Sequence, residues 1–105
     1  MTKTQICMDN CRLQTVIEAT LIDGDVVRLN IESDCASVRK LSDELREISI
    51  FQMGKTLLDS PVYNLASRHL RHLACLVPAA IIRTIEAEAG MALPCEARIS
   101  VEKLP

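Results

Sequence analysis

Two alternating segments on either side of an acidic turn constrain the fold of this chain more than any other feature. From residue 13 to residue 21 the odd positions are apolar or small and most even positions are polar. The same alternation returns at Val27, Leu29 and Ile31, after the turn signal Asp23-Gly24-Asp25. A period of two predicts strands with one buried face, and Asp-Gly favours a tight turn. The sequence therefore predicts a β-hairpin.

Burial of the apolar face also predicts the register of this hairpin. A two-residue loop would place Leu21 opposite Val26, and the apolar faces of the two strands would then conflict. A three-residue loop aligns them, through the pairs Leu21–Val27, Ala19–Leu29 and Ile17–Ile31. Extended to Leu13, this register places Cys35 opposite Leu13. We therefore expect Cys11 and Cys35 at the same end of the hairpin, away from its turn.

Three helices are expected after the hairpin. Ser33 or Asp34 caps the first, and its buried positions recur at helical spacing up to Ile48. The second begins at Ser60-Pro61, a cap followed by a first-turn proline. The third begins at Pro78 and ends at Gly90, with the chain broken near 75–77 because proline disfavours helix at the preceding residue. Residues 49–60 either extend the first helix or form a loop.

The two ends of the chain complete the predicted architecture. Residues 1–10 show no clear period, and we expect a loose lead-in. Residues 97–101 alternate and predict a short final strand. The expected fold is a single α+β domain of residues 1–105 with two layers. In it, a three-stranded, mostly antiparallel sheet, in the order β-β-α-α-α-β, carries the helices on one face.

Composition excludes several classes of partner. Aromatic residues make up 2% of the chain and the net charge is −2, so neither stacking rings nor a basic surface is present for nucleic acid. The longest apolar run, 73–82, is too short to span a bilayer and contains Pro78. The first ten residues lack the apolar run of a signal peptide, which favours a cytoplasmic location. Small residues on one side of the third helix (Ala80, Thr84 and Ala87) would allow close packing of a second element of the chain or of a partner subunit in a homodimer.

Five cysteines are the main chemical signal. In a cytoplasmic protein they favour metal binding or thiol chemistry over a disulfide framework. Cys35 falls at a helix N-terminus and Cys75 just ahead of another, where the helix dipole favours a thiolate. Cys7 and Cys11 precede the hairpin. Cys95, beside Pro94, is expected to be core filler.

The two histidines lie close to Cys75 in sequence. His69, His72 and Cys75 are spaced by three, so one continuous helix would stack them along a ridge. His69 falls on the apolar stripe and is expected to be a hydrogen-bonded core residue, which leaves His72 as the better ligand. The candidate ligands of a zinc ion or an iron–sulfur cluster are therefore Cys7, Cys35 and Cys75, with His72 or Cys11 as the fourth.

The sequence does not predict a catalytic apparatus. No pairing of a nucleophile with a base is apparent, and the three glycines form no phosphate-binding loop. One interpretation is a module that binds a metal ion or an iron–sulfur cluster, and the sequence leaves open whether the chain is an enzyme. The alternatives are a homodimeric structural or interaction protein whose cysteines fill the core, and an enzyme that uses a thiolate at Cys35 or Cys75.

Several short motifs together resemble an uncharacterised family of small proteins from anaerobic bacteria and archaea. They are Ile6-Cys7, residues 32–35 (ESDC), 60–63 (SPVY), 72–81 (HLACLVPAAI) and 90–94 (GMALP). The resemblance picks out Cys7, Cys35, His72 and Cys75. The chain departs from the pattern at Met8-Asp9, where Gly-Phe is expected, and at Leu76, where proline is expected.

A fainter similarity is to iron–sulfur cluster scaffold proteins. They place cysteines before a hairpin, at a helix start and ahead of a later helix, and Cys7-Met8-Asp9 resembles their Cys-x-Asp motif. Their later His and Cys are adjacent, whereas His72 and Cys75 are separated.

Overall fold

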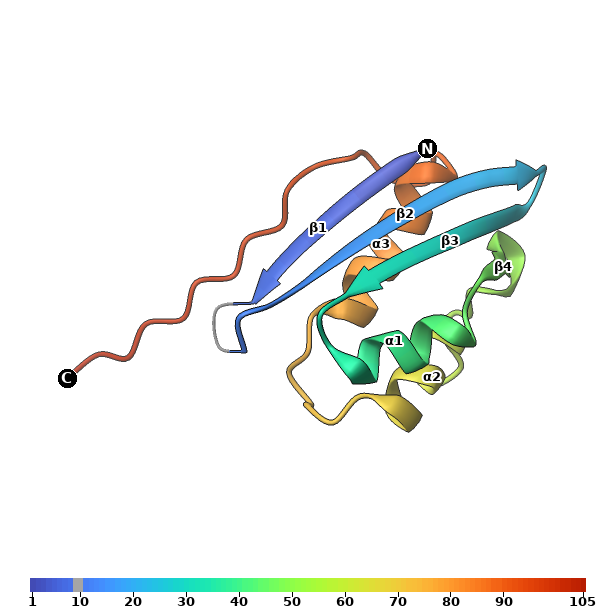
Figure 1. Cartoon of the computed structure of the whole chain (residues 1–105). Helices are drawn as coiled ribbons and strands as arrows, with labels where there is room; N and C mark the ends of the chain where they lie inside the picture. The colour runs from blue at the N-terminus through green and yellow to red at the C-terminus, as the bar shows by residue number, and fades with distance from the viewer. Residues whose placement is uncertain (9–10) are drawn as a thin grey trace.

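A computed structural model describes residues 1–8 and 11–105 and shows one antiparallel sheet with three helices on one of its faces (Figure 1). The sheet has four strands in the order β1-β2-β3-β4, where the sequence predicted three. The elements are β1 (Thr2–Met8), β2 (Leu13–Asp23), β3 (Val26–Ser33), α1 (Ala36–Asp43), β4 (Glu47–Ser49), a 3-10 turn (Ile50–Gln52), α2 (Pro61–His69) and α3 (Val77–Glu88).

The predicted hairpin is confirmed with its register. β2 and β3 pair Leu21 with Val27, and this register continues through the next apolar pairs toward Thr15 opposite Ser33. The turn is made by Gly24 and Asp25, and a bulge between Leu21 and Asp23 supplies the extra residue. One-sided burial therefore determines this pairing, as expected.

The helix boundaries agree in part with the prediction. The Ser60 hydroxyl accepts from the backbone N–H of Tyr63 at 3.2 Å and caps α2, and Pro61 opens that helix. Gly90 follows the C-cap of α3 with a φ of 75°, as the C-cap prediction requires. The first helix is shorter than expected and ends at Asp43, so Ile48 lies in β4.

The ends of the chain differ from the prediction. Residues 2–8, expected to be a loose lead-in, form β1, which pairs with β2 along its whole length. Residues 97–101 form no strand: the segment 91–105, here called the C-terminal tail, is extended and every residue in it is exposed. The observed order is therefore β-β-β-α-β-α-α. No helix in the described part of the chain is long and apolar enough to cross a membrane.

The core lies between the sheet and the helices and is entirely aliphatic. Its completely buried members include Ile17 and Val27 from the sheet and Leu41, Ile81 and Ile85 from the helices. Thr84 is also buried; its hydroxyl donates to the Ala80 carbonyl at 2.6 Å and lies 2.7 Å from the Thr4 hydroxyl, which ties α3 to β1. α3 therefore lies firmly against the first two strands.

Candidate thiol site

Three cysteines from separate segments come to one end of the sheet. Cys11 lies in the turn between β1 and β2, Cys35 is the N-cap of α1, and Cys75 lies two residues before α3. A pair of hydrogen bonds ties the start of β2 to the start of α1. The Asp34 N–H donates to the Gln14 carbonyl at 3.0 Å, and the Gln14 N–H donates to the Asp34 carboxylate at 3.1 Å. This contact places Cys11 and Cys35 at the same end, as the hairpin register predicts.

The position of Cys35 is fixed by the end of β3. Its backbone N–H donates to the Ser33 hydroxyl at 3.1 Å, and that hydroxyl is also hydrogen-bonded to the buried Thr15 at 2.7 Å. Its thiol is half-buried and packs against the hydrophobic core. Ser33 and Asp34, expected as helix caps, act instead as the brace that holds Cys35 in place.

Cys75 lies in the irregular segment between α2 and α3. Its N–H donates to the His72 carbonyl at 3.3 Å, and its thiol is half-buried against the core. Burial raises the pKa of the Cys75 thiol, and the nearby thiols of Cys35 and Cys11 raise it further, while the Val77 N–H acts in the opposite direction. Charges affect each other's titration only at short range in a screened medium. The three thiols therefore share one neighbourhood.

Cys11 is held by a tight turn. Its thiol lies 3.8 Å from the Met8 carbonyl, and the next residue, Arg12, also donates its N–H to that carbonyl at 2.7 Å. Arg12 has a φ of 58°, an uncommon conformation for a residue with a side chain. Cys11 is half-buried.

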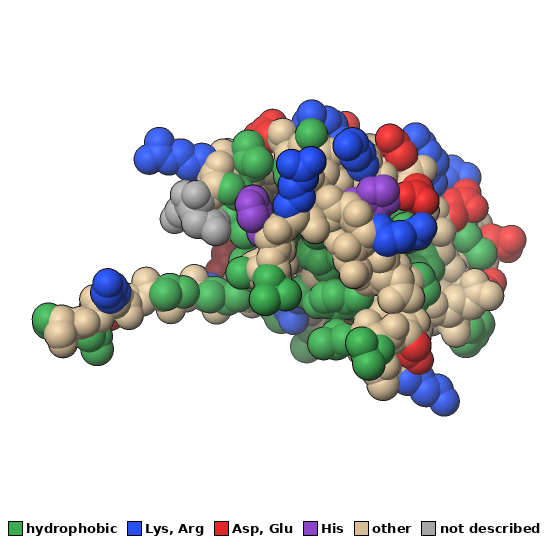
Figure 2. Space-filling model, turned by 90° about the horizontal axis from the view of Figure 1, so that it is seen from below, with side chains coloured by type: hydrophobic (Ala, Val, Ile, Leu, Met, Phe, Trp, Pro, Cys, Tyr) green, Lys and Arg blue, Asp and Glu red, His purple; other side chains and the backbone are tan. Residues whose placement is uncertain are grey.

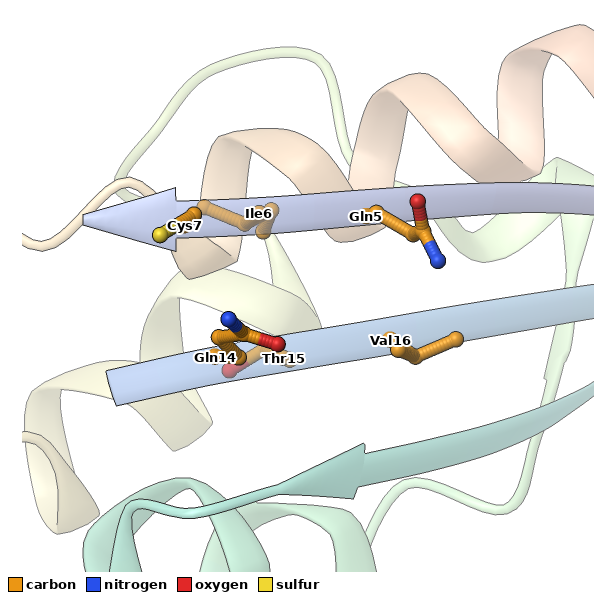
Figure 3. Close-up of a pocket in the computed structure, with 6 residues that line it drawn as sticks. All are labelled: Gln5, Ile6, Cys7, Gln14, Thr15 and Val16. Carbon is orange, nitrogen blue, oxygen red and sulfur yellow. The ribbon is translucent and has the colours of Figure 1, made fainter. Parts of the chain in front are cut away.

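The remaining two cysteines lie apart from this group. Cys7 is exposed on the face of the sheet that carries no helices, opposite Gln14 (Figure 3), beside a shallow hollow of about 210 Å³ between β1 and β2. Cys95 is exposed in the C-terminal tail, where it accepts from the Arg83 guanidinium at 3.4 Å. The prediction that Cys95 fills the core is therefore wrong, because residues 91–105 do not join the sheet.

The histidines do not form the expected ridge with Cys75. α2 ends at His69, so His72 and Cys75 are not on the same helix. His69 is half-buried and is hydrogen-bonded to the Glu44 carboxylate of the loop after α1, which agrees with its expected hydrogen-bonded role. His72 is exposed. The two histidine side chains form separate purple patches on the surface in Figure 2.

The thiols do not form a ready-made metal centre. Among residues 1–8 and 11–105, no group of three or more His, Cys, Asp or Glu side chains is arranged to hold a metal ion. Asp9, which belongs to the Cys-x-Asp motif, lies outside the described residues. Cys11, Cys35 and Cys75 are therefore neighbours rather than a preformed set of ligands.

Comparison with known proteins identifies a family but not an activity. The model of a family of unknown function, DUF6951, matches residues 2–101, and the chain belongs to that family. Neither the curated proteins nor the solved structures contain a significant match.

Proposed function

We propose that this protein is a metal-binding module in which Cys11, Cys35 and Cys75 provide the thiolate ligands. The observation that carries the proposal is the convergence of three half-buried thiols from three separate segments at one end of the sheet. Three thiolates with one imidazole are a common ligand set for zinc, and thiolates also hold iron–sulfur clusters. His72, three residues before Cys75, is the proposed fourth ligand.

The segments that carry the ligands differ in how firmly they are held. Cys35 is braced by Ser33 and Asp34, whereas Cys11 lies in a turn and Cys75 lies between two helices. Metal binding would draw Cys11 and Cys75 toward Cys35, with small changes in two irregular segments and none in the sheet. The exposure of His72 leaves its ring free to turn inward.

The same placement favours Cys11 over Cys7 as a ligand. In β1, Thr4 and Ile6 alternate with exposed residues, and Cys7 belongs to the exposed set. Side chains on opposite faces of a strand diverge, so the Cys7 thiol points away from the half of the molecule that contains Cys35 and Cys75. The proposed site therefore omits Cys7, although Cys7 was a candidate by sequence.

Anaerobic purification followed by metal analysis and absorption spectroscopy tests this proposal. We expect about one zinc ion or one cluster per chain, retained by Cys95→Ser and by Cys7→Ser and lost from Cys35→Ser and Cys75→Ser. The apo protein titrated with Co²⁺ should develop a thiolate charge-transfer band in the first pair of variants and not in the second. A folded protein that takes up no zinc, iron or Co²⁺ would overturn the proposal.

The second candidate is a non-catalytic interaction protein whose half-buried cysteines only fill space. It is favoured by the lack of a ready-made ligand group among the described residues and by the packing of Cys35 and Cys75 on the core. If it holds, Cys35→Ala and Cys75→Ala will fold normally and the wild type will be metal-free as purified.

A further inference from the structure

The C-terminal tail has the pattern of a strand but pairs with no strand in the part of the chain that the structure describes. Ala97, Ile99 and Val101 alternate with polar residues. Ile99 is 68% exposed and Val101 is 92% exposed. Figure 2 shows hydrophobic side chains along a segment that stands clear of the body of the molecule. An alternating segment gains stability as a strand only when its apolar face is covered and its backbone groups are paired.

The outer edge of β1 is unpaired, and a further strand can be added to it. Within the described residues β1 pairs only with β2, so its outer edge presents unpaired backbone N–H and C=O groups. Beside that edge lies a groove of about 930 Å³, bounded by β1, α3 and the tail from Ala92 to Ser100. The α3 side of the groove is lined by three small residues, Ala79, Ala80 and Ala87, and by the larger Leu76, Arg83 and Glu86. A strand added to β1 would cover this surface.

The start of the tail is anchored to α3, and the tail then follows the groove as far as Ser100. The backbone N–H groups of Met91 and Ala92 both donate to the Glu86 carbonyl, at 2.8 and 3.3 Å, and Arg83 holds Cys95. After Cys95, the only side-chain hydrogen bonds within the described residues are internal, between Arg98 and Glu96. Figure 1 shows that the tail continues past the end of β1. The molecule is accordingly elongated, with extents of 51, 28 and 25 Å.

The direction of the tail favours a strand from another molecule over the chain's own. The tail runs in the same direction as β1 in Figure 1, so a strand formed within one chain would pair in parallel. Every pair in the observed sheet is antiparallel, and parallel pairing is slightly less stable per residue. A tail from a second copy is free to approach β1 in the antiparallel direction.

We propose that two copies of this chain exchange their tails, with residues 95–102 of each copy adding as a fifth strand to the outer edge of β1 in the other. The outer edge of β1 and the tail are both unpaired within the described residues, so a two-fold dimer pairs the two in each copy. The exchanged strand then covers the small residues of α3 with Ala97, Ile99 and Val101. Its other side chains, Glu96, Arg98 and Glu102, lie beside Lys3 on the open face, which is the face of the sheet without helices. This proposal is independent of any metal.

Light scattering on the full-length protein, in chelator and reductant, tests the exchange. The wild type is expected to have twice the mass of the chain at high micromolar concentration and to dissociate on dilution. Ile99→Asp places a charge on the covered face and should give a monomer with unchanged circular dichroism. Ser100→Asp places the same charge one residue away, on the open face, and should remain a dimer.

Three results would overturn the exchange. They are a wild type that is monomeric at every concentration, a dimer that survives Ile99→Asp, and a dimer that Ser100→Asp disrupts equally. A disulfide test separates exchange from pairing within one chain. An antiparallel strand of residues 95–102 beside Thr2–Met8 places Glu96 near Cys7, so Glu96→Cys under mild oxidation should give a covalent dimer through Cys7 of the other copy. Parallel pairing within the chain places Ser100 near Cys7 instead, so a covalently closed monomer formed by Ser100→Cys would contradict the proposal.

Discussion

The five cysteines fall into two sets that differ in position rather than in chemistry. Cys11, Cys35 and Cys75 are half-buried on irregular segments and helix starts at one end of the sheet, whereas Cys7 and Cys95 are exposed and solitary. Spacing in the sequence does not separate the sets, because Cys7 and Cys11 are only four residues apart and β1 ends between them. Only Cys7 lies in a strand, where the alternation of β1 turns its side chain to the solvent; the other four cysteines lie outside the strands.

The largest expected effect is a loss of stability, caused by a substitution in the core against which the half-buried cysteines pack. Ile81 is completely buried in α3, and Ile81→Ala should lower the free energy of unfolding by about 2–5 kcal/mol through lost burial and a cavity. Cys75, just ahead of α3, should then react with alkylating agents nearly as fast as the exposed set. Leu93→Ala is the matched control: Leu93 is 84% exposed, and a change above about 0.5 kcal/mol there would contradict the packing described.

A smaller effect is expected at Glu88, which holds the other end of α3. The Glu88 carboxylate accepts from the Leu21 N–H and the Thr2 hydroxyl, both at 2.8 Å, and lies 3.4 Å from the Met1 amino group. The Leu21 hydrogen bond is the main reason that the pKa of Glu88 is lowered; Thr2 adds to it, and burial opposes it. Loss of a hydrogen bond to a charged group costs about 1.5–3 kcal/mol, so Glu88→Gln should destabilise the protein near neutral pH by up to that amount.

The same lowered pKa predicts how this contribution depends on pH. A carboxyl whose pKa is lower in the folded state stabilises the protein above its unfolded pKa, and that stability is lost as pH falls through the folded value. The difference between wild type and Glu88→Gln in urea unfolding should therefore shrink from pH 7 toward acid. A difference that is constant or grows below about pH 4 would show that the Glu88 charge is not what these contacts stabilise.

In the metal-free protein, the exposed cysteines should be alkylated about ten times faster than the half-buried ones. The raised pKa of Cys75 lowers its thiolate fraction, and burial restricts access, so Cys75 should be the slowest of the five. Cys7 and Cys95 should be the fastest because both are exposed. Mass spectrometry of peptides after timed alkylation measures each rate. Equal rates at all five positions would show that the two sets are not distinct in solution.

The smallest effects are expected from single serine substitutions in the metal-free protein. Cys35→Ser places a hydroxyl against the core and should cost about 1 kcal/mol, since it loses apolar contact without gaining a partner. Cys7→Ser and Cys95→Ser should change the free energy of unfolding by less than about 0.5 kcal/mol. Chemical denaturation in chelator gives all three values, and a large loss in Cys95→Ser would mean that the tail is packed rather than exposed.

Local patterns predicted the parts of the fold that are decided locally. One-sided burial determined the β2–β3 register, and Ser60-Pro61 and Gly90 determined helix ends. The predictions for both ends of the chain were wrong, because residues 2–8 form a strand and residues 97–101 do not. Residues 2–8 show no clear period yet form β1 against the free edge of β2, while residues 97–101 alternate clearly yet pair with no strand among the described residues. Whether a segment becomes a strand depends on a distant partner that the pattern does not specify.

The candidate site was predictable to a similar degree. The hairpin register alone was enough to place Cys11 near Cys35. Cys75 lies ahead of the third helix as expected, although α3 begins at Val77, one residue before the predicted start at Pro78. The spacing of His69, His72 and Cys75 misled because α2 ends at His69. The sequence did not predict that Ser33 and Asp34 hold Cys35 in place, since helix capping is the more common role of these residue types. Only the position of Gln14 in the hairpin register could have indicated the hydrogen bonds that they form.

Protection of individual thiols by zinc tests the central claim most directly. The reduced apo protein is mixed with one equivalent of Zn²⁺, alkylated, and mapped by mass spectrometry. We predict that zinc slows alkylation of Cys11, Cys35 and Cys75 together and leaves Cys7 and Cys95 unchanged. Zinc that protects none of the three, or that protects Cys7 and Cys95 equally well, would contradict a metal site built on the converging thiols.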